Sequence, residues 1–294
     1  MKGTFLITSE QVKAYGACPE GYRFFMKEFP KGGEYQAILD KCCDVGRADW
    51  AEWLLRRVGP TEDVREYEEH VNESTLQIVF AGRVVFKIGA FIKLLIAGTG
   101  IEAGWGIKAG EGIEAGEGIK AGEGIKAGEG IEAGEGIEAG EGIKAGEGIE
   151  AGWGIKAGWG IKAGEGIEAG WGIKAGEGIE AGEGIKAGWG IKAGEGIKAG
   201  EGIKAGEGIK AGWGIKAGWG IKAGWGIKAG EGIKAGWGIK AGEGIEAGEG
   251  IEAGLEYGVF AGLRVKVTNW SRSAKVTAKT KPDNLISGHW QDAE

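Results

Sequence analysis

The sequence predicts a mainly β protein, in which a β-solenoid follows a small helical domain and ends in a β cap. A six-residue unit, I-[K/E]-A-G-[E/W]-G, runs without insertion or deletion from Ile101 to Gly254 and places 26 isoleucines six residues apart. Such a short fixed period is typical of a stack of small structural steps that bury their apolar faces against one another. The chain has 65 Gly in 294 residues but only 4 Pro, which excludes collagen and polyproline linkers.

Positions 1–75 have the pattern of a helical head. Ser9 is placed to cap a short helix that ends at Gly16, and Pro19 suits the first position of a second helix that ends near Pro30. We expect a third helix over 34–45.

Two further helices are predicted in the head. Trp50, Trp53 and Leu54 are spaced as one apolar helix face, and Gly59-Pro60 ends that helix. Thr61 is placed to cap a last helix that carries Val64, Tyr67 and Val71.

Residues 76–98 are rich in Val, Ile and Phe and are predicted to form capping strands ahead of the solenoid at 99–254. The tetrad Val79-Phe80-Ala81-Gly82 recurs as Val259-Phe260-Ala261-Gly262 beyond the other end of the repeat. Both match the I-x-A-G half of the unit with Phe at the Lys/Glu position, so we interpret them as terminal coils whose outer faces are covered, as open solenoid ends require.

One repeat unit predicts a three-residue strand and a corner. Ile and Ala point one way and the charged residue points the other way. The two Gly that flank the Glu/Trp position form the corner, since Gly tolerates positive φ. The period leaves two coil sizes open: a flat 12-residue coil of two units or a triangular 18-residue coil of three. The alternative is a disordered Gly-rich tract, but Ile, Ala and both Gly never vary while the two other columns do.

Residues 255–294 are predicted to form the C-terminal cap and tail. Positions 263–280 alternate like a hairpin, with Val265 and Val267 on one strand and Val276 and Ala278 on the other. The tail from Lys281 is expected to be irregular.

The charge balance argues against nucleic acid as a partner. The net charge is −7, and the repeat contributes 17 Lys against 25 Glu, so an acidic rod should repel phosphate backbones. The longest apolar stretch, 84–97, contains Lys87 and Lys93 and is too short to cross a bilayer. Three cysteines, two of them adjacent, favour reduced thiols and a cytoplasmic location.

Tryptophan is the feature of the repeat with the clearest functional potential. All nine tract tryptophans are followed three residues later by Lys, which suggests packing of the Lys stem or a cation–π contact. Trp in a column shared with Glu must tolerate solvent, and nine exposed indoles form an unusual apolar surface. If they line one edge, that edge is a contact surface. The candidate interaction surface is Trp105, Trp153, Trp159, Trp171, Trp189, Trp213, Trp219, Trp225 and Trp237.

Catalysis finds little support in the sequence. His70 and His289 lie in opposite flanks, and no phosphate loop, nucleophile motif or metal-ligand spacing stands out. Cys18, Cys42 and Cys43 lack the spacing of a zinc knuckle and suit a helical core better. We therefore predict no catalytic residue, no metal site and no cofactor, and a protein that is not an enzyme.

The opening segment resembles the small helical module at the start of some bacteriophage and prophage repeat proteins. The resemblance rests on 16–18, on 24–30 and on Ala48-Asp49-Trp50 with Trp53-Leu54. It implies a helical head followed by a regular solenoid. The repeat shares its spacing with the left-handed hexapeptide-repeat acyltransferases but not their pattern, because Glu or Trp stands two places before Ile where that family favours a small residue.

Taken together, the sequence predicts a non-enzymatic structural or interaction protein. A rigid acidic rod presents repeated Glu, Lys and Trp columns along its length, so weak contacts add up. We expect a homo-oligomer that forms through solenoid faces, or a protein partner. The alternatives are an acidic nucleic-acid mimic that inhibits a DNA-binding protein, and small-ligand or sugar binding on the Trp columns.

Overall fold

Each repeat unit forms one short strand and one turn. In the computed structural model, which describes residues 5–293, Ile and Ala of every unit are buried and the residue between them faces solvent. Strands β7 (Ile101–Ala103) to β31 (Ile245–Ala247) all run from an Ile to the Ala two residues later, and β32 covers Ile251–Glu252. The predicted orientation of Ile and Ala toward a shared interior is confirmed.

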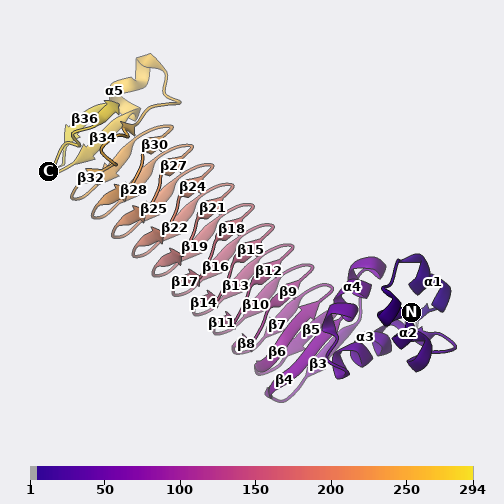
Figure 1. Ribbon diagram of the computed structural model, residues 1–294. Coiled ribbons are helices and arrows are strands. Elements are labelled where there is room, and N and C mark those ends of the chain that lie inside the picture. Colours follow the sequence, from indigo (N-terminus) through magenta and orange to yellow (C-terminus); the bar gives the residue numbers. More distant parts are fainter. Residues whose placement is uncertain (1–4, 294) are drawn as a thin grey trace.

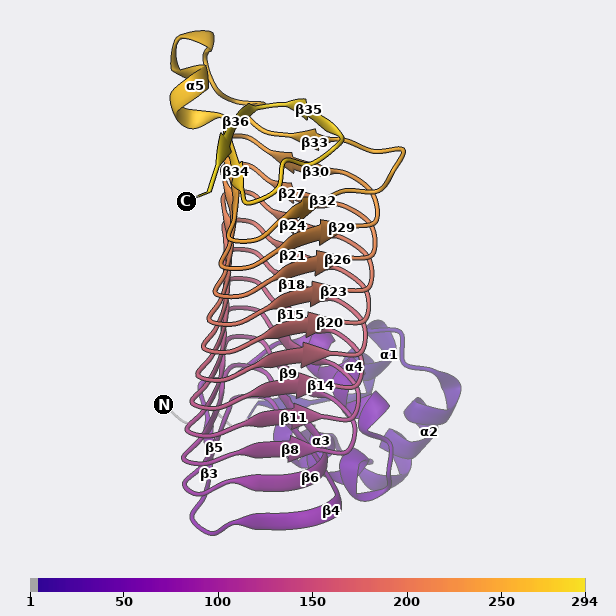
Figure 2. The ribbon, with the colours of Figure 1, turned by 90° about the vertical axis from the view of Figure 1, so that its left-hand side faces the viewer.

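The solenoid has triangular coils. Each strand pairs in parallel with the strand three repeat units later, so that Ile119 lies beside Ile137 and Ala121 beside Ala139. Three units therefore make one coil, and the alternative of a flat coil of two units is wrong. Figure 2 shows the coils stacked along a straight rod.

The triangular cross-section divides the rod into three faces. Face 1 contains the nine strands that start at Ile101 and recur at every third unit to Ile245. Face 2 contains the strands that start at Ile107 and at every third unit from there to Ile251. Face 3 contains those that start at Ile113 and at every third unit from there to Ile239. At about 4.8 Å per coil, the nine strands of face 1 extend over roughly 40 Å.

Three edges join these faces. Edge 1 joins face 1 to face 2 and contains position 105 and its equivalents in the later coils. Edge 2 joins face 2 to face 3 and contains position 111 and its equivalents. Edge 3 joins face 3 to face 1 of the next coil and contains position 117 and its equivalents.

The corner glycines are required for a different reason from the one expected. Positive φ occurs at six described glycines, all of them outside 101–254, so the corners do not use the left-handed region. The Gly after each Ala instead stacks directly on its equivalent in the preceding coil. From Gly116 to Gly254, an added Cβ would overlap the carbonyl oxygen of that equivalent Gly, far inside the 3.0 Å limit of real contacts.

The solenoid begins earlier in the chain than the sequence predicted. The helix expected after Thr61 is wrong, because β3 (Val64–Tyr67) and β4 (Val71–Phe80) are strands. They are followed by β5 (Arg83–Phe86) and β6 (Ala90–Ala97). β3 and β5 extend face 1 on the N-terminal side of β7. β4 and β6 are longer, and each spans both face 2 and face 3.

Both tetrads lie in terminal coils, as predicted, but only one has the expected register. Val259 pairs with Ile239 and Phe260 with Lys240, so this Phe takes the Lys/Glu position. At the other end the register is shifted by one residue. Phe80 is aligned with Ala97 and points into the solenoid core, whereas Val79 points outward.

The head consists of four helices and a two-stranded ribbon. The helices are α1 (Ser9–Ala14), α2 (Pro19–Glu28), α3 (Tyr35–Asp44) and α4 (Ala48–Val58), and the ribbon pairs β1 (Leu6–Ile7) with β2 (Gly33–Glu34). Thr8, rather than the predicted Ser9, caps α1 by accepting a hydrogen bond from the Gln11 amide. The predicted helix start at Pro19 is confirmed.

The head covers the N-terminal end of face 3. Val79, Ala81 and Ile96, on the outer side of β4 and β6, share one apolar cluster with buried residues of α3 and α4. Beyond this cluster, a guanidinium nitrogen of Arg56 lies 3.3 Å from a carboxylate oxygen of Glu114. Burial between the head and the rod raises the pKa of Glu114 despite this nearby Arg. The predicted covering of the terminal coil is thus supplied by the head (Figure 1).

The C-terminal cap differs from the predicted hairpin. The chain leaves β33 (Val259–Phe260), forms the short helices η1 (Val267–Asn269) and α5 (Trp270–Ser273), and returns to the rod as β34 (Lys275–Ala278). The tail expected to be irregular instead adds β35 (Leu285–Ser287) and β36 (His289–Asp292). All three late strands pair in parallel, because they continue the winding of the solenoid rather than turning back.

Candidate interaction surface

The nine tract tryptophans stand at the apices of the edges. Each lies between two glycines at a corner, and 46–59% of each residue is exposed. The sequence prediction that Trp shares a solvent-facing column with Glu is confirmed. The indoles are therefore available for contacts outside the chain.

The tryptophans do not line a single edge. Trp105, Trp159 and Trp213 lie on edge 1, three coils apart from one another. Edge 2 has Trp219 and Trp237, and edge 3 has the remaining four. The proposed contact surface thus divides into three columns that face different directions.

Two columns contain stacked rings. On edge 3, the ring centroids of Trp153 and Trp171 are 5.7 Å apart, and those of Trp171 and Trp189 are 5.2 Å apart. On edge 2, Trp219, Trp237 and Tyr257 form a second stack, with centroid separations of 5.2 and 5.6 Å. The coil rise is close to the spacing that stacked aromatic rings prefer, so neighbouring tryptophans stack without distorting the backbone.

The suggested cation–π contact between Trp and the following Lys is wrong for the residues described here. The lysines that do lie over an aromatic ring are Lys108, over Phe91, and Lys240, over Phe260. A Trp and the Lys three residues later instead lie on opposite sides of the same face. Three residues of extended chain separate them by roughly 10 Å.

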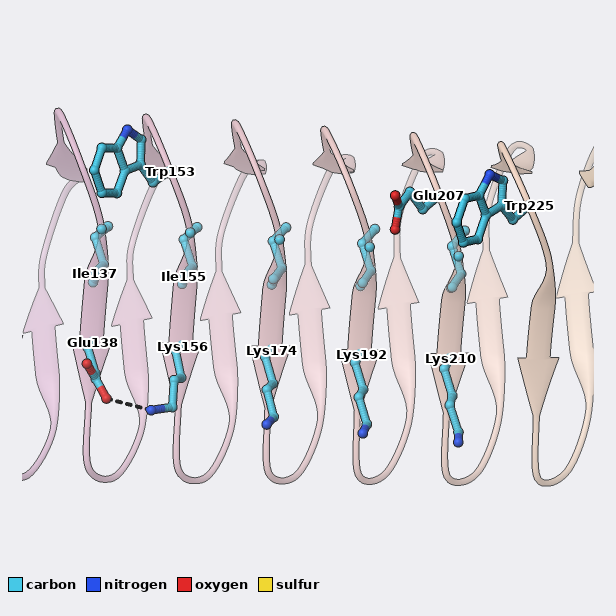
Figure 3. Close-up of a pocket in the computed structure, with 18 of the residues that line it drawn as sticks. Ile137, Glu138, Trp153, Ile155, Lys156, Lys174, Lys192, Glu207, Lys210 and Trp225 are labelled. Atoms are coloured by element: carbon cyan, nitrogen blue, oxygen red, sulfur yellow. Dashed lines mark hydrogen bonds and ion pairs between the residues drawn. The ribbon is translucent and has the colours of Figure 1, made fainter. Parts of the chain in front are cut away.

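This separation makes a shallow groove along each face. On face 1 the groove has Trp153, Glu207 and Trp225 on one side and a column of lysines on the other, with Gly and Ile backbone as its floor (Figure 3). Arg83 lines the groove near the N-terminal end of the rod, and Arg272 of α5 lines it near the C-terminal end. Similar grooves follow face 2 and the C-terminal half of face 3.

The period of three units also separates charges that look mixed in the sequence. On face 3 the outward column has four glutamates followed by four lysines: Glu114, Glu132, Glu150, Glu168, Lys186, Lys204, Lys222 and Lys240. On edge 2, six successive coils contain Glu: Glu111, Glu129, Glu147, Glu165, Glu183 and Glu201. The net charge of the chain does not reveal this separation, because it sums the charges of all three faces and edges.

Most opposite charges that are neighbours in a column form ion pairs, although Lys120, between Glu102 and Glu138, lies within 4.0 Å of neither carboxylate. Lys156 lies 2.6 Å from Glu138 in the preceding coil, and its hydrogen bond lowers the pKa of that carboxyl. Glu180 lies between Lys162 and Lys198, at 3.1 and 3.4 Å, and its pKa is lowered mainly by the hydrogen bond from Lys162.

Of the other residues considered for chemistry, His70 lines the groove of face 2 together with Trp105, whereas the three cysteines lie in the head. Nδ1 of His70 is 2.8 Å from the Gly89 carbonyl oxygen, and His289 begins β36. In the head, burial raises the pKa of the Cys42 thiol to about 12 and that of Cys43 to about 11. Within residues 5–293, no three His, Cys, Asp or Glu side chains are placed to hold a metal ion. No helix in this range is long and apolar enough to cross a membrane.

Comparison with known protein families finds a match to the head. The family model described as the YdhT N-terminal domain matches residues 1–58, which contain the four head helices. No curated protein and no solved structure shows a significant match. The head is therefore similar to a domain recognised in other chains, and this match does not extend to the solenoid.

Proposed function

We propose that this protein is a non-enzymatic structural rod that self-associates through the aromatic columns of its edges. The observation that supports this most is the stack of Trp153, Trp171 and Trp189, in which three half-exposed indoles form a continuous apolar ridge. Exposed apolar ridges of this kind mark interaction sites on soluble proteins. Aromatic residues are also enriched where interfaces have their strongest contacts.

The rod supplies the geometry for many weak contacts to act together. All coils have the same pairing between equivalent strands, so side chains on a column are equally spaced along a straight line. Once one side chain of a column binds its partner, the next side chain along the column is already in position, and the affinity rises with the number of such contacts. The free thiols of Cys18, Cys42 and Cys43 are consistent with a cytoplasmic location for this assembly.

The lysine columns favour this function over nucleic-acid mimicry. A mimic of DNA would need a surface of uniform negative charge, as phosphates provide. The acidic edge 2 is instead bordered on face 2 by Lys108, Lys126, Lys144 and Lys162 in four successive coils.

The test compares molar mass as a function of concentration for the wild type and for a variant with all nine tract tryptophans changed to Glu. We expect the wild type to sediment as oligomers and the variant as a monomer. Two triple variants then locate the surface: Trp153, Trp171 and Trp189 to Glu on edge 3, and Trp105, Trp159 and Trp213 to Glu on edge 1. The two triple variants change the net charge equally. Only the edge 3 variant should show a lower molar mass of the assembly than the wild type. An unchanged mass in the nine-residue variant would refute self-association through tryptophan.

A further inference from the structure

Face 1 contains a ladder of five lysines, of which the rod itself neutralises only the two at the ends. The ladder consists of Lys156, Lys174, Lys192, Lys210 and Lys228, in five successive coils. The first and last are paired with Glu138 and Glu246. Among the described residues, no carboxylate lies within 4.0 Å of the three ammonium groups between them.

Such a ladder is unfavourable in the isolated rod. Lys174 is directly beside Lys192 in the sheet, and Lys192 is beside Lys210. Like charges at paired positions of neighbouring strands repel one another. A surface with the opposite charge at the same spacing would remove this repulsion.

Edge 2 of the same rod is such a surface. Of its six glutamates, Glu111 lies 3.3 Å from Lys93, whereas the next five have no cationic partner within 4.0 Å among the described residues. These five are Glu129, Glu147, Glu165, Glu183 and Glu201. Each is flanked by two glycines, so the edge is narrow and its carboxylates protrude from a backbone without neighbouring side chains.

We propose that the acidic edge 2 of one copy binds in the groove of face 1 of a second copy. Both ladders have five rungs, and both have the rise of the same solenoid, so all five carboxylates meet ammonium groups in one alignment. A DNA strand, with a phosphate about every 3.4 Å, falls out of register after a few rungs. Trp153 and Trp225 stand on the opposite side of the groove and pack against the Gly-Glu-Gly turns of the incoming edge.

The head and the cap leave both surfaces open. The head lies on face 3 beside the first coils, with Arg56 on Glu114, and Glu129, Glu147, Glu165 and Glu183 of edge 2 are exposed. Edge 2 and face 1 are different surfaces of one chain, so the contact is heterologous and extends into filaments or sheets rather than closing as a dimer. This inference rests on the proposed self-association and names the two surfaces that meet.

Charge reversal tests the pairing. One variant carries Lys174→Glu, Lys192→Glu and Lys210→Glu, and the other carries Glu147→Lys, Glu165→Lys and Glu183→Lys. At low salt, sedimentation velocity should show that each variant alone associates about tenfold more weakly than the wild type, or worse. An equimolar mixture should recover the large assemblies, because every edge then finds a groove of opposite charge.

Matched controls separate this pairing from general charge effects. A variant with Lys216→Glu, Lys222→Glu and Lys240→Glu changes the net charge equally but on faces 2 and 3, beyond the five carboxylates of edge 2, and it should associate like the wild type. Circular dichroism establishes that each variant keeps the solenoid. If both reversed variants still assemble, or if mixing them restores nothing, the edge-in-groove contact is wrong, although association through another surface stands. A wild type that stays monomeric at every concentration and salt would overturn both proposals.

Discussion

The indole of Trp171 lies parallel to that of Trp189, with an interplanar angle of 3° and a centroid separation of 5.2 Å. The two residues are three repeat units apart in the chain and occupy the same edge of successive coils. This relationship follows from the coil size, because only a triangular coil places residues three units apart next to one another. The aromatic column is thus a direct consequence of the backbone winding.

Loss of this stacking should lower the stability of the rod. Trp171→Ala removes ring contacts with both Trp153 and Trp189, each worth about 0.5–1.5 kcal/mol. We expect the free energy of unfolding in urea to fall by roughly 1–3 kcal/mol, measured at a dilution where the protein is monomeric. Trp159→Ala is the matched control, since Trp159 is equally exposed but unstacked, and its effect should stay within about 0.5 kcal/mol. Equal losses in both variants would contradict a stabilising stack.

The two glycine positions of the repeat should respond differently to alanine. A Cβ on Gly176 would overlap the Gly158 carbonyl oxygen of the preceding coil, whereas a Cβ on Gly172 would lie 3.3 Å from the Gly190 oxygen. Gly176→Ala must separate two coils and should cost about 3 kcal/mol or more. Gly172→Ala should cost about 1 kcal/mol or less. Thermal unfolding of the two variants provides the comparison, and similar melting temperatures would show that close stacking of the coils is not what requires Gly176.

The inward orientation of Ile and Ala could be predicted from the sequence, because a fixed six-residue spacing leaves one consistent way to bury them. The coil size could not, because both two and three units per coil are compatible with that spacing. The charge separation on face 3 and the acidic edge 2 were hidden for the same reason. They appear only when residues three units apart are placed in one column.

The two ends of the solenoid were predicted less well because they lack the repeat. Val64, Tyr67 and Val71 have helix-like spacing, but Val64 and Tyr67 pair with Arg83 and Phe86 in a strand. Likewise, nothing in the composition of 281–294 shows that Trp290 aligns with Val276 of β34. Pairing with an existing coil determines the structure there, so tertiary contacts override local propensity.

The three thiols should differ in reactivity. Cys18 is exposed, whereas Cys42 is buried with a thiol pKa raised to about 12, and Cys43 has a pKa raised to about 11. Since the thiolate is the reacting form, a disulfide reagent at pH 8 should modify one thiol rapidly in the native protein and the other two only after unfolding. Cys18→Ser should abolish the fast phase, while its hydroxyl keeps a side-chain acceptor for the Gly21 amide. A rapid reaction of two or three thiols would disagree with the packing of α3.

The ion pair between Lys156 and Glu138 should make a small contribution to stability that depends on pH. The pKa of Glu138 is lowered in the folded state, so this contribution is complete above the unfolded value of about 4.5 and is lost as the pH falls through the folded pKa. Glu138→Gln should therefore lower the free energy of unfolding at pH 7, by less than about 1 kcal/mol. Below the folded pKa of Glu138, the substitution should leave the free energy of unfolding unchanged. Glu132→Gln is the control, because Glu132 lies between Glu114 and Glu150 in a column of like charge. Its removal should be neutral or stabilising at pH 7, and a loss equal to that of Glu138→Gln would contradict the assignment.

The head should be needed to keep the N-terminal end of face 3 from aggregating. Removal of residues 1–58 exposes Val79, Ala81 and Ile96, which pack against α3 and α4 in the whole chain. An apolar strand surface beside the end of a solenoid promotes association between chains. We expect residues 59–294 to bind a hydrophobic dye and to precipitate at concentrations where the whole chain stays in solution.

The same truncated chain with Val79→Thr and Ile96→Thr separates loss of this cover from loss of folding. Both substitutions keep β-branched residues at outward strand positions, so the coils should form as before. Solubility should recover and dye binding should fall. If the doubly substituted chain precipitates as readily as the truncated one, the head stabilises the first coils themselves, and its role as a cover for face 3 is wrong.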